Sequence, residues 1–391
     1  MLCFAIFSRV GRYPVRGGTM EVRCAVIGIG TMGKKYAGMI GAGKIKGLTL
    51  TAVVCRSESN AVWAKENLPP STAVYASEDG LYEHPETFDA VIIVTPHKSH
   101  PPIAIRALNA GKHVMCDKPA GVTVADALSI NEAASNSDRV YAMMCHQRTY
   151  ACYRKIKELL DECSLGHINR VMLENSGFFR TEFYHKSGEW RSSWNGEGGG
   201  ALINQGYHLL DMWQYLFGLP QSVYADIPFG KYNGFAVDDE ATVIFDYPEK
   251  VTGTFVISTG EGSPTERLEI VGTKGRILLD GNKLTLTHFD CDTREYSKNA
   301  QVTSGQELNI SEKQFVFEEE DRAYEIMLEN FADAVLYGKE PIACGADSVK
   351  TLSLINAAYL SAWKGKKICL PMDNDEYVSA LHEREKSELN G

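Results

Sequence analysis

The sequence lacks the features that mark several large classes of protein. Its ten cysteines include no Cys-x-x-Cys pair, and its histidines and acids show no credible zinc spacing, so we expect reduced thiols and no metal. It has no lysine and arginine cluster, and a net charge of −10 disfavours nucleic acid and anionic membranes as main partners. No repeat, low-complexity tract or membrane-spanning apolar run is present. These absences favour an enzyme that acts on small molecules.

The length and composition predict a soluble globular protein of about two domains. The chain has 391 residues, which is too long for one ordinary core. Of these residues, 44% are hydrophobic and 23% charged, as is typical of a soluble globular protein. Residues 1–20 are a predicted N-terminal extension, interpreted as an upstream start or a disordered arm. Its apolar run, Leu2–Phe7, is short and is followed by Ser8 and Arg9, so a secretory signal is unconvincing and a cytoplasmic location is expected.

An apolar strand pattern runs into a Gly-x-Gly-x-x-Gly turn near the start of the chain. In a dinucleotide site the first glycine allows the tight turn, the second the approach of a pyrophosphate, and the third the packing of the next helix. The same glycines would suit an ordinary turn in another α/β protein, but the segments that follow favour the nucleotide site. The residues expected to bind the cofactor there are Gly28, Gly30, Thr31, Met32 and Gly33.

Short apolar runs alternate with helix-like segments over residues 21–147, which is typical of βαβ units and a parallel sheet. This region is the predicted Rossmann domain for NAD or NADP. The helix over 124–134 has Thr123 as a plausible N-cap. The predicted strands are 22–28, 48–55, 90–95, 113–116 and 140–145, and the other predicted helices are 34–40 and 101–110.

Residues that directly follow the strands are candidates for the site, because ligands bind at the carboxyl ends of parallel strands. After the second strand, Arg56 stands where many NAD-binding domains have an acid, and with Ser57 it would suit the 2′-phosphate of NADP. Arg56 would equally suit a solvated residue that stacks on adenine, and Glu58 keeps NAD open. After the third strand, Thr95, Pro96 and His100 belong to a loop expected to pass under the cofactor, or to an ordinary capped turn.

Asp117 and Lys118 follow the fourth strand and precede a proline. Proline disfavours helix at the residue before it, so the Lys118 ammonium should project toward the place of the nicotinamide. A solvated loop lysine is the plain alternative.

From residue 148 to residue 370 the pattern changes to that of a second α/β domain, and residues 371–391 form a polar tail. Strands joined by short turns predict an antiparallel meander. The acidic run 318–321 is interpreted as the solvated start of a helix that reaches Tyr337. The other predicted helices are 153–160, 202–217 and 348–363, and the predicted strands are 168–178, 222–227, 241–247, 251–258, 267–272, 275–279 and 283–287.

The helix predicted over 202–217 carries three polar residues at helical spacing. Asn204, His208 and Asp211 are spaced i, i+4 and i+7, so they are expected to share one face, and the preceding glycines would let the helix start lie close to a ligand. A buried histidine bonded to Asn204 is the structural alternative. The loop before this helix mixes rings with donors, as sugar-binding loops and packed interfaces both do. Its candidate sugar contacts are Tyr184, Trp190, Arg191 and Trp194.

Together, these motifs resemble the glucose-fructose oxidoreductase / inositol dehydrogenase / MocA (Gfo/Idh/MocA) family over residues 21–370. The resemblance is carried by the glycine turn, Thr95-Pro96 with His100, Asp117-Lys118-Pro119 and Gly-Gly-Gly-x-x-x-Asn-x-x-x-His over 198–208. It implies a Rossmann domain followed by an α/β domain with an open, mostly antiparallel sheet that often forms homo-oligomers. It also implies NAD(P)-linked oxidation or reduction of a sugar, polyol or glycoside.

Carried over by position, the resemblance makes Lys118 and His208 the motif lysine and histidine, and Arg148 similar to a family arginine near the cofactor. Arg148 would also suit an interdomain salt bridge. Asn204 stands where many members have Asp, and an amide cannot stabilise an imidazolium as a carboxylate does. His208 suits proton transfer, Lys118 suits stabilisation of charge on the oxygen, and Asn204 would orient both.

The loop and helix together also look like a branch that oxidises glucosides at the 3-hydroxyl. Two alternatives stay open. One is an NAD-dependent glycosidase that oxidises C3 transiently and eliminates the leaving group. The other is a non-catalytic sensor of sugar or cofactor, which the joint presence of Lys118 and His208 disfavours.

Overall fold

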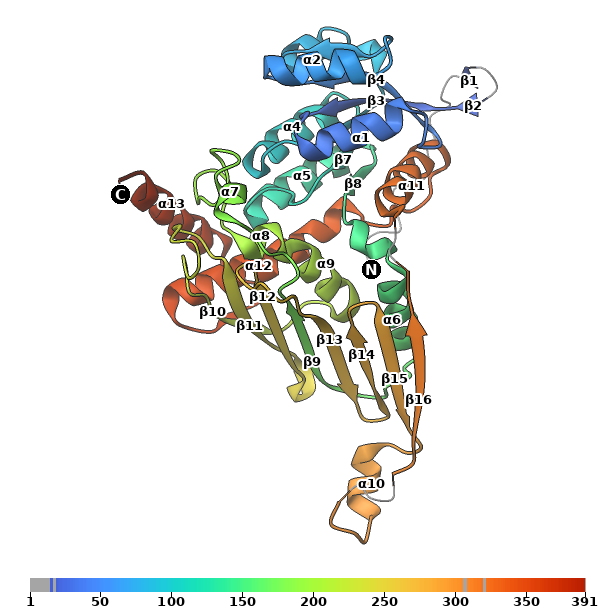
Figure 1. The fold of residues 1–391 in the computed structure, drawn as a ribbon, viewed down its shortest axis with the longest axis vertical. Helices are drawn as coiled ribbons and strands as arrows, with labels where there is room; N and C mark the ends of the chain where they lie inside the picture. Colours follow the sequence, from blue (N-terminus) through green and yellow to red (C-terminus); the bar gives the residue numbers. More distant parts are fainter. Residues whose placement is uncertain (1–14, 17–18, 305–307, 319–320, 391) are drawn as a thin grey trace. The chain divides into compact units, whose positions relative to one another are not determined.

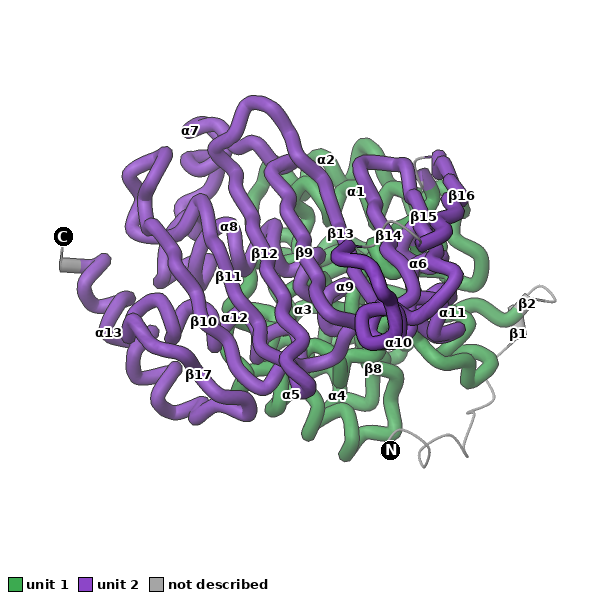
Figure 2. Tube along the Cα trace, turned by 90° about the horizontal axis from the view of Figure 1, so that it is seen from below, with its two compact units in different colours: residues 1–149, 322–349 green, residues 150–321, 350–391 purple. Residues whose placement is uncertain are grey.

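The computed structural model describes residues 15–16, 19–304, 308–318 and 321–390. Most of the predicted N-terminal extension, residues 1–14 and 17–18, therefore lies outside the described residues. The chain divides into two compact units, Met1–Thr149 with Arg322–Val349, and Tyr150–Asp321 with Lys350–Gly391 (Figure 2). Within the described residues, no helix is long and apolar enough to span a membrane.

The first unit is built on a parallel sheet of six strands in the order β5-β4-β3-β6-β7-β8 (Figure 1). Apart from the edge strand β5, the strands are almost wholly buried, as expected for a parallel sheet with helices on both faces. The predicted Rossmann sheet is confirmed, with one strand, β5, that the sequence analysis missed. The strands are β3 Val22–Ile27, β4 Leu48–Val54, β5 Ala73–Tyr75, β6 Ala90–Ile93, β7 His113–Cys116 and β8 Tyr141–Met143, with a separate pair β1 Val15–Arg16 and β2 Thr19–Met20.

Three helices of this unit begin at a side chain that caps the first turn, Ser57, Ser77 or Thr123. In α5, the Thr123 hydroxyl accepts the Asp126 N–H at 3.0 Å while the Asp126 carboxylate accepts the Thr123 N–H at 2.9 Å, a reciprocal capping box. The helices are α1 Thr31–Gly41, α2 Glu58–Asn67, α3 Glu78–Tyr82, α4 His100–Asn109, α5 Val124–Ser137 and α11 Ala323–Tyr337, and the 3₁₀ turns are η1 Pro85–Thr87, η2 His97–Ser99, η3 His146–Thr149 and η5 Gly345–Asp347.

Residues 322–349, which the sequence analysis assigned to the second domain, return to the first unit. The Met143 N–H of β8 donates to the Ala343 carbonyl at 3.0 Å, so the returning segment lies along the edge of the parallel sheet. The acidic run was expected to start the helix. The structure instead begins α11 at Ala323, after Glu318 and Asp321.

The second unit is built on a nine-stranded sheet in the order β16-β15-β14-β13-β9-β12-β11-β10-β17. All neighbouring strands are antiparallel except β9 and β12, so the predicted mostly antiparallel sheet is confirmed. The predicted single meander is wrong, because β9 inserts between β12 and β13. The strands are β9 Ile168–Asn175, β10 Ser222–Asp226, β11 Glu240–Asp246, β12 Thr252–Ser258, β13 Glu266–Gly272, β14 Gly275–Asp280, β15 Lys283–Phe289, β16 Ile310–Val316 and β17 Ile368–Cys369.

One face of this sheet is covered by helices and carries the core of the second unit. Trp213 packs on Phe245 and Phe255, and a Cβ added to Gly253 would lie 2.4 Å from the Trp213 ring. The predicted polar tail is a helix, α13. The helices are α6 Ala151–Asp161, α7 Glu182–His185, α8 Ala201–Asn204, α9 Gly206–Phe217, α10 Thr293–Asn299, α12 Ser348–Lys364 and α13 Asn374–Asn390, with the 3₁₀ turn η4 Pro248–Lys250.

Candidate active site

The turn between β3 and α1 has the geometry that a dinucleotide needs. Gly28 has φ +98°, and a Cβ there would lie 2.5 Å from the Val94 carbonyl oxygen. A Cβ on Gly33 would lie 1.9 Å from the Gly28 carbonyl oxygen, so helix and turn are in direct contact. Gly30, the N-cap of α1, faces open space, and the first turn of α1 has no acidic side chain. This open helix N-terminus fits a pyrophosphate.

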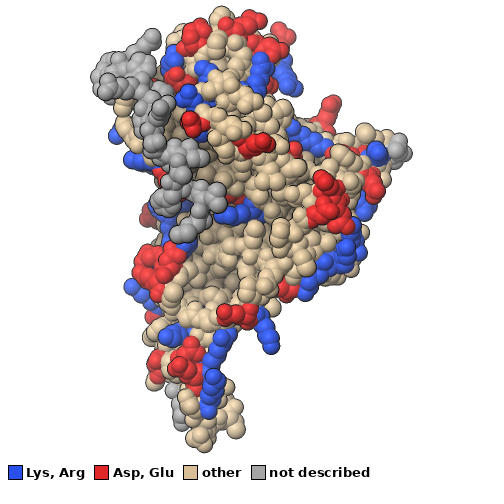
Figure 3. Space-filling view, turned by 180° about the vertical axis from the view of Figure 1, so that it is seen from behind, with Lys and Arg blue, Asp and Glu red and all other residues tan. Residues whose placement is uncertain are grey.

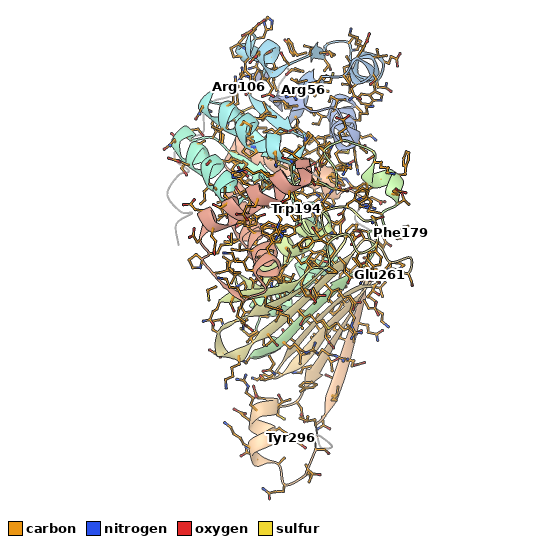
Figure 4. The ribbon with its side chains drawn as sticks, turned by 90° about the vertical axis from the view of Figure 1, so that its left-hand side faces the viewer. Arg56, Arg106, Phe179, Trp194, Glu261 and Tyr296 are labelled. Carbon is orange, nitrogen blue, oxygen red and sulfur yellow. The ribbon has the colours of Figure 1, made fainter. Side chains whose placement is uncertain are left out.

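Arg56 is a solvated side chain at the carboxyl end of β4. Its side chain is 85% exposed, and its guanidinium lies 4.0 Å from Glu78 (Figure 4). Ser57 caps α2 by accepting the Asn60 N–H at 3.4 Å, which leaves its own O–H as a donor. Arg56 is therefore accessible to a nucleotide, but only weakly held.

His100 joins two of the loops at the carboxyl edge of the sheet. Its ring nitrogens lie 2.6 Å from the carbonyl oxygens of Pro119 and Thr95, and the residue is 1% exposed. Burial lowers the pKa of His100. The two carbonyl oxygens favour the protonated ring and so act in the opposite direction, but the effect of burial is larger. The expectation of a cofactor contact is corrected for His100, because the side chain is enclosed and holds the loops after β6 and β7 together. Pro96 is exposed beside it, and the Thr95 hydroxyl accepts a bond from Ser99 at 2.8 Å.

Asp117 organises the end of β7. Its carboxylate accepts the Lys118 N–H at 2.8 Å and the Tyr36 hydroxyl of α1 at 3.3 Å, and burial raises the pKa of this carboxyl. Lys118 is half-buried. Its charge acts together with burial to lower the pKa of His146, which follows β8, to about 3. Asp117 and Lys118 stand in a motif that the sequence reveals, whereas Tyr36 and His146 lie in ordinary helix and turn patterns and were not predicted.

Arg148 is a structural residue of the first unit. Its side chain is 2% exposed, and it donates to the Asp347 carboxylate at 2.9 Å and to the Ile342 carbonyl at 3.3 Å. Both partners belong to the returning segment. The expectations of a cofactor contact or an interdomain salt bridge are therefore corrected to an ion pair inside one unit.

The predicted helix 202–217 is two helices. The structure ends α8 at Asn204 and begins α9 at Gly206, with Gln205 in helical geometry between them. Asn204 and His208 are half-buried, whereas Asp211 is 2% exposed and accepts hydrogen bonds from Gln214 at 3.1 Å and Thr351 at 3.3 Å. Asp211 thus faces the interior of its unit, and the expected shared face is reduced to Asn204 and His208.

The glycines before α8 are required by packing. A Cβ on Gly200 would lie 1.8 Å from the Asp238 carbonyl oxygen, and one on Gly199 would lie 2.2 Å from the Tyr359 hydroxyl. The Asp238 carboxylate accepts the N–H groups of Gly200 at 2.8 Å and Leu202 at 2.6 Å, and burial raises its pKa. These glycines were expected to admit a ligand. They admit Asp238 instead, which the sequence analysis missed because it lies far along the chain.

The loop before α8 contains a connected polar cluster. The Tyr184 hydroxyl accepts hydrogen bonds from Arg191 at 2.8 Å and from Asn204 and Gln205 at 3.2 Å each. The Arg191 guanidinium also stacks on the rings of Tyr184 and Trp190, at 4.5 and 4.4 Å from their centroids. The structure therefore connects Tyr184 and Arg191, two of the predicted substrate contacts, to Asn204.

Trp194 is a core residue. It is 2% exposed, packs edge-on against Tyr359 and Trp363, and donates its indole N–H to the Ala236 carbonyl at 3.0 Å (Figure 4). The expectation that it contacts sugar is corrected.

Among the described residues, no group of three His, Cys, Asp or Glu side chains could hold a metal ion. Lys, Arg, Asp and Glu are interspersed on the face shown in Figure 3.

Two family models match the chain. The model for an oxidoreductase family with an NAD-binding Rossmann fold matches residues 22–145, and the model for the GFO/IDH/MocA C-terminal domain matches residues 153–278. The fold and the glycine turn fit a dinucleotide, and the first model gives the class, an oxidoreductase with an NAD-binding Rossmann domain. The chain belongs to the Gfo/Idh/MocA oxidoreductase family, as its motifs led us to expect.

Individual relatives share between 21% and 31% sequence identity with this chain over the regions that align. The uncharacterized oxidoreductase YdgJ of Escherichia coli is 31% identical over 59% of this chain and 63% of its own length, so the chain spans less than two thirds of it. The trans-1,2-dihydrobenzene-1,2-diol dehydrogenase of Mus musculus is 26% identical over 66% of this chain and 74% of its own length. The crystal structure of the WlbA dehydrogenase from Bordetella pertussis with NADH and UDP-GlcNAcA has a TM-score of 0.75 at 21% identity, covering 90% of this chain and 100% of that one. This structural likeness concerns the fold.

Proposed function

We propose that the protein is an NAD(P)-dependent dehydrogenase that acts on a secondary hydroxyl of a sugar, polyol or glycoside. The observation that carries the proposal is the combination, on one parallel sheet, of the open glycine turn after β3 with Lys118 at the end of β7. Ligands of such sheets bind at this edge. The names of the mouse relative, a diol dehydrogenase, and of the B. pertussis complex, with a nucleotide sugar, agree with a hydroxylated substrate.

The chemistry divides between a cofactor and three side chains. Bound NAD(P) supplies the nicotinamide that accepts the hydride from carbon. The alcohol must also lose the proton on oxygen, a task that suits the His208 imidazole. By the family resemblance, the Lys118 ammonium would stabilise the negative charge that develops on that oxygen, and Asn204 would orient the hydroxyl. Arg56, exposed after β4, takes the 2′-phosphate if the cofactor is NADP.

For the substrate, we propose oxidation of a glucoside at C3 to a 3-keto sugar. The support is the resemblance of the loop and helix to that branch, and the polar cluster in which Tyr184 and Arg191 connect to Asn204. Trp190, stacked with Arg191, offers an aromatic face of the kind that sugar rings contact.

The test is cofactor identification followed by a substrate screen. Mass spectrometry of the purified protein identifies a copurified nucleotide, and a panel of glycosides, free sugars and inositols is then followed at the absorbance of reduced nicotinamide. The expected result is turnover with at least one glycoside and a stable keto-sugar product. Release of free aglycone without net NAD(P)H would instead mean a glycosidase with internal redox chemistry. Tight nucleotide binding without turnover of any compound would mean a sensor.

We also propose that the protein forms homo-oligomers through the sheet face of the second unit that lies opposite Trp213. The support is the exposure of apolar side chains on neighbouring strands, with Tyr224 39% and Ile244 41% exposed. Light scattering coupled to gel filtration measures the assembly, and Ile244→Glu should reduce it to a smaller species. An unchanged mass for that variant would place the contact elsewhere.

A further inference from the structure

Glu197, just before the glycines, is a buried carboxylate that meets Asn204. It is 3% exposed, and one of its oxygens accepts the Ser192 N–H at 2.7 Å. The other oxygen accepts a hydrogen bond from Asn204 Nδ2 and lies 3.8 Å from Arg191 Nη1. The backbone N–H and the guanidinium both interact favourably with the ionised form of the carboxylate.

This contact fixes which way the Asn204 amide points. An ionised carboxylate only accepts hydrogen bonds, so the branch of the amide that faces Glu197 must be the NH₂ group. The second hydrogen of that group is directed to the Tyr184 hydroxyl at 3.2 Å. The carbonyl oxygen Oδ1 is therefore the group that Asn204 presents on its other side, and it can act only as an acceptor.

We propose that Glu197 is a positioning residue that locks Asn204 with its acceptor oxygen toward the substrate. The inference deepens the proposed function and rests on it: the locked oxygen receives a donor, either the reacting hydroxyl or the His208 ring one helical turn along. The site thereby distinguishes a ligand group that donates from one that only accepts, such as a keto oxygen.

The same geometry explains why an amide, and not an acid, stands at position 204. A carboxylate there would meet the Glu197 carboxylate in a buried place, where two like charges cannot both persist. One of the two would have to hold a proton, and the activity would depend on that proton. The pair therefore works as one carboxylate and one amide, and the arrangement should also function with the two exchanged.

Exchange of the two groups is the test. Glu197→Gln offers an NH₂ group to Asn204, which must then turn its carbonyl inward and its donor toward the substrate. We expect kcat to fall about 10- to 100-fold, the range that corresponds to leaving one buried polar group mismatched, with little change in the cofactor KM. Asn204→Asp should lower kcat similarly and make the activity decline as pH rises and the shared proton is lost.

The double variant Glu197→Gln/Asn204→Asp should recover activity relative to both single variants. In it, the new amide at position 197 can donate to one oxygen of the new carboxylate at position 204 and leave the other oxygen as acceptor. Additive losses in the double variant would overturn the proposal. Glu182→Gln is the matched control, because Glu182 belongs to the same loop but pairs with Lys186 at the surface. It should change neither kcat nor the pH profile.

A second readout needs no substrate. Thermal unfolding of the four proteins should show the same coupling, with the double variant more stable than the sum of the single effects predicts. If no substrate is turned over but this coupling is observed, the orientation of Asn204 by Glu197 stands and the dehydrogenase function fails. If the wild-type protein turns over a substrate but neither kinetics nor thermal unfolding shows coupling between positions 197 and 204, the orientation of Asn204 by Glu197 is wrong and the dehydrogenase function stands.

Discussion

The carboxylate of Glu388, in the last helix, accepts a hydrogen bond from the backbone N–H of Trp194 at 2.9 Å, in the loop that precedes α8. Its second oxygen accepts the N–H of Asn195 at the same distance. The loop that carries Tyr184 and Arg191 is thus held from outside its own sequence, by a residue close to the end of the described chain.

Glu388→Gln should loosen this loop. An amide has a single acceptor atom and carries no charge, so one of the two backbone N–H groups loses a charge-assisted bond, for a cost of about 1–2 kcal/mol in loop stability. We expect faster hydrogen exchange over residues 186–196 and a raised substrate KM. Glu383→Gln, on the exposed side of α13, is the control. Equal exchange in both variants would show that the contact does not hold the loop.

Substitutions of two glycines in the β3–α1 turn should affect nucleotide affinity and the free energy of unfolding separately. Gly30→Ala adds a methyl group to open space, so the free energy of unfolding should change by less than about 1 kcal/mol while nucleotide affinity falls at least about tenfold. Gly33→Ala places its methyl group on the Gly28 carbonyl and should destabilise the fold itself. Chemical denaturation and nucleotide titration measure the two effects. Unchanged affinity in Gly30→Ala would mean that no phosphate approaches that turn.

Lys118→Ala should greatly lower kcat and leave cofactor affinity nearly unchanged. If the ammonium stabilises charge on the reacting oxygen, kcat should fall at least about 100-fold, while the nucleotide dissociation constant stays within about tenfold of wild type. Steady-state kinetics and direct titration give the two numbers. Lys46→Ala, at an exposed loop position, is the control. Turnover like that of wild type would take Lys118 out of the mechanism.

Stability should fall in mild acid because of His113. Burial, with the charge of Arg139, lowers the pKa of His113 to about 4, and its Nδ1 accepts the Val140 N–H at 3.0 Å. The unfolded chain, with a histidine pKa of about 6.5, binds the proton first, so stability is full above pH ~6.5 and declines toward pH ~4, by about 3 kcal/mol.

His113→Asn keeps an acceptor for Val140 but cannot titrate, so its stability should depend less on pH across that window. Urea unfolding at a series of pH values compares the two proteins. Parallel curves for variant and wild type would assign the acid sensitivity to other groups, among which His146 has its pKa lowered in the same direction.

Local patterns predicted the parts of the fold that depend on neighbours in sequence. The apolar runs gave the buried parallel strands, and the glycine turn and Thr123 cap marked the starts of α1 and α5. β5 was not predicted, because it has only three residues, all half-buried, which are too few to give a hydrophobic pattern. The place of β9 between β12 and β13 depends on pairings with strands far along the chain, which no local signal contains.

The site shows the same limit. Asp117, Lys118, Asn204 and His208 were predicted because they occupy motif positions. The partners that decide what a motif residue does lie elsewhere: Asp347 is 199 residues from Arg148, and Asp238 is 38 residues from Gly200. Glu197 directly precedes the glycines in the sequence, but only the hydrogen bond from Asn204 in the structure shows that the two side chains meet.

The chain order of the first unit affects its biosynthesis. A ribosome releases the six parallel strands early, but α11 and the Asp347 partner of Arg148 emerge only after eight of the nine strands of the second unit's sheet, β9 to β16, have been made. The nascent nucleotide domain must wait, incomplete, for more than 170 further residues. An expression fragment that stops at residue 149 would leave the buried guanidinium of Arg148 without its carboxylate, and one designed to isolate this domain should instead join residues 322–349 to it by a short linker.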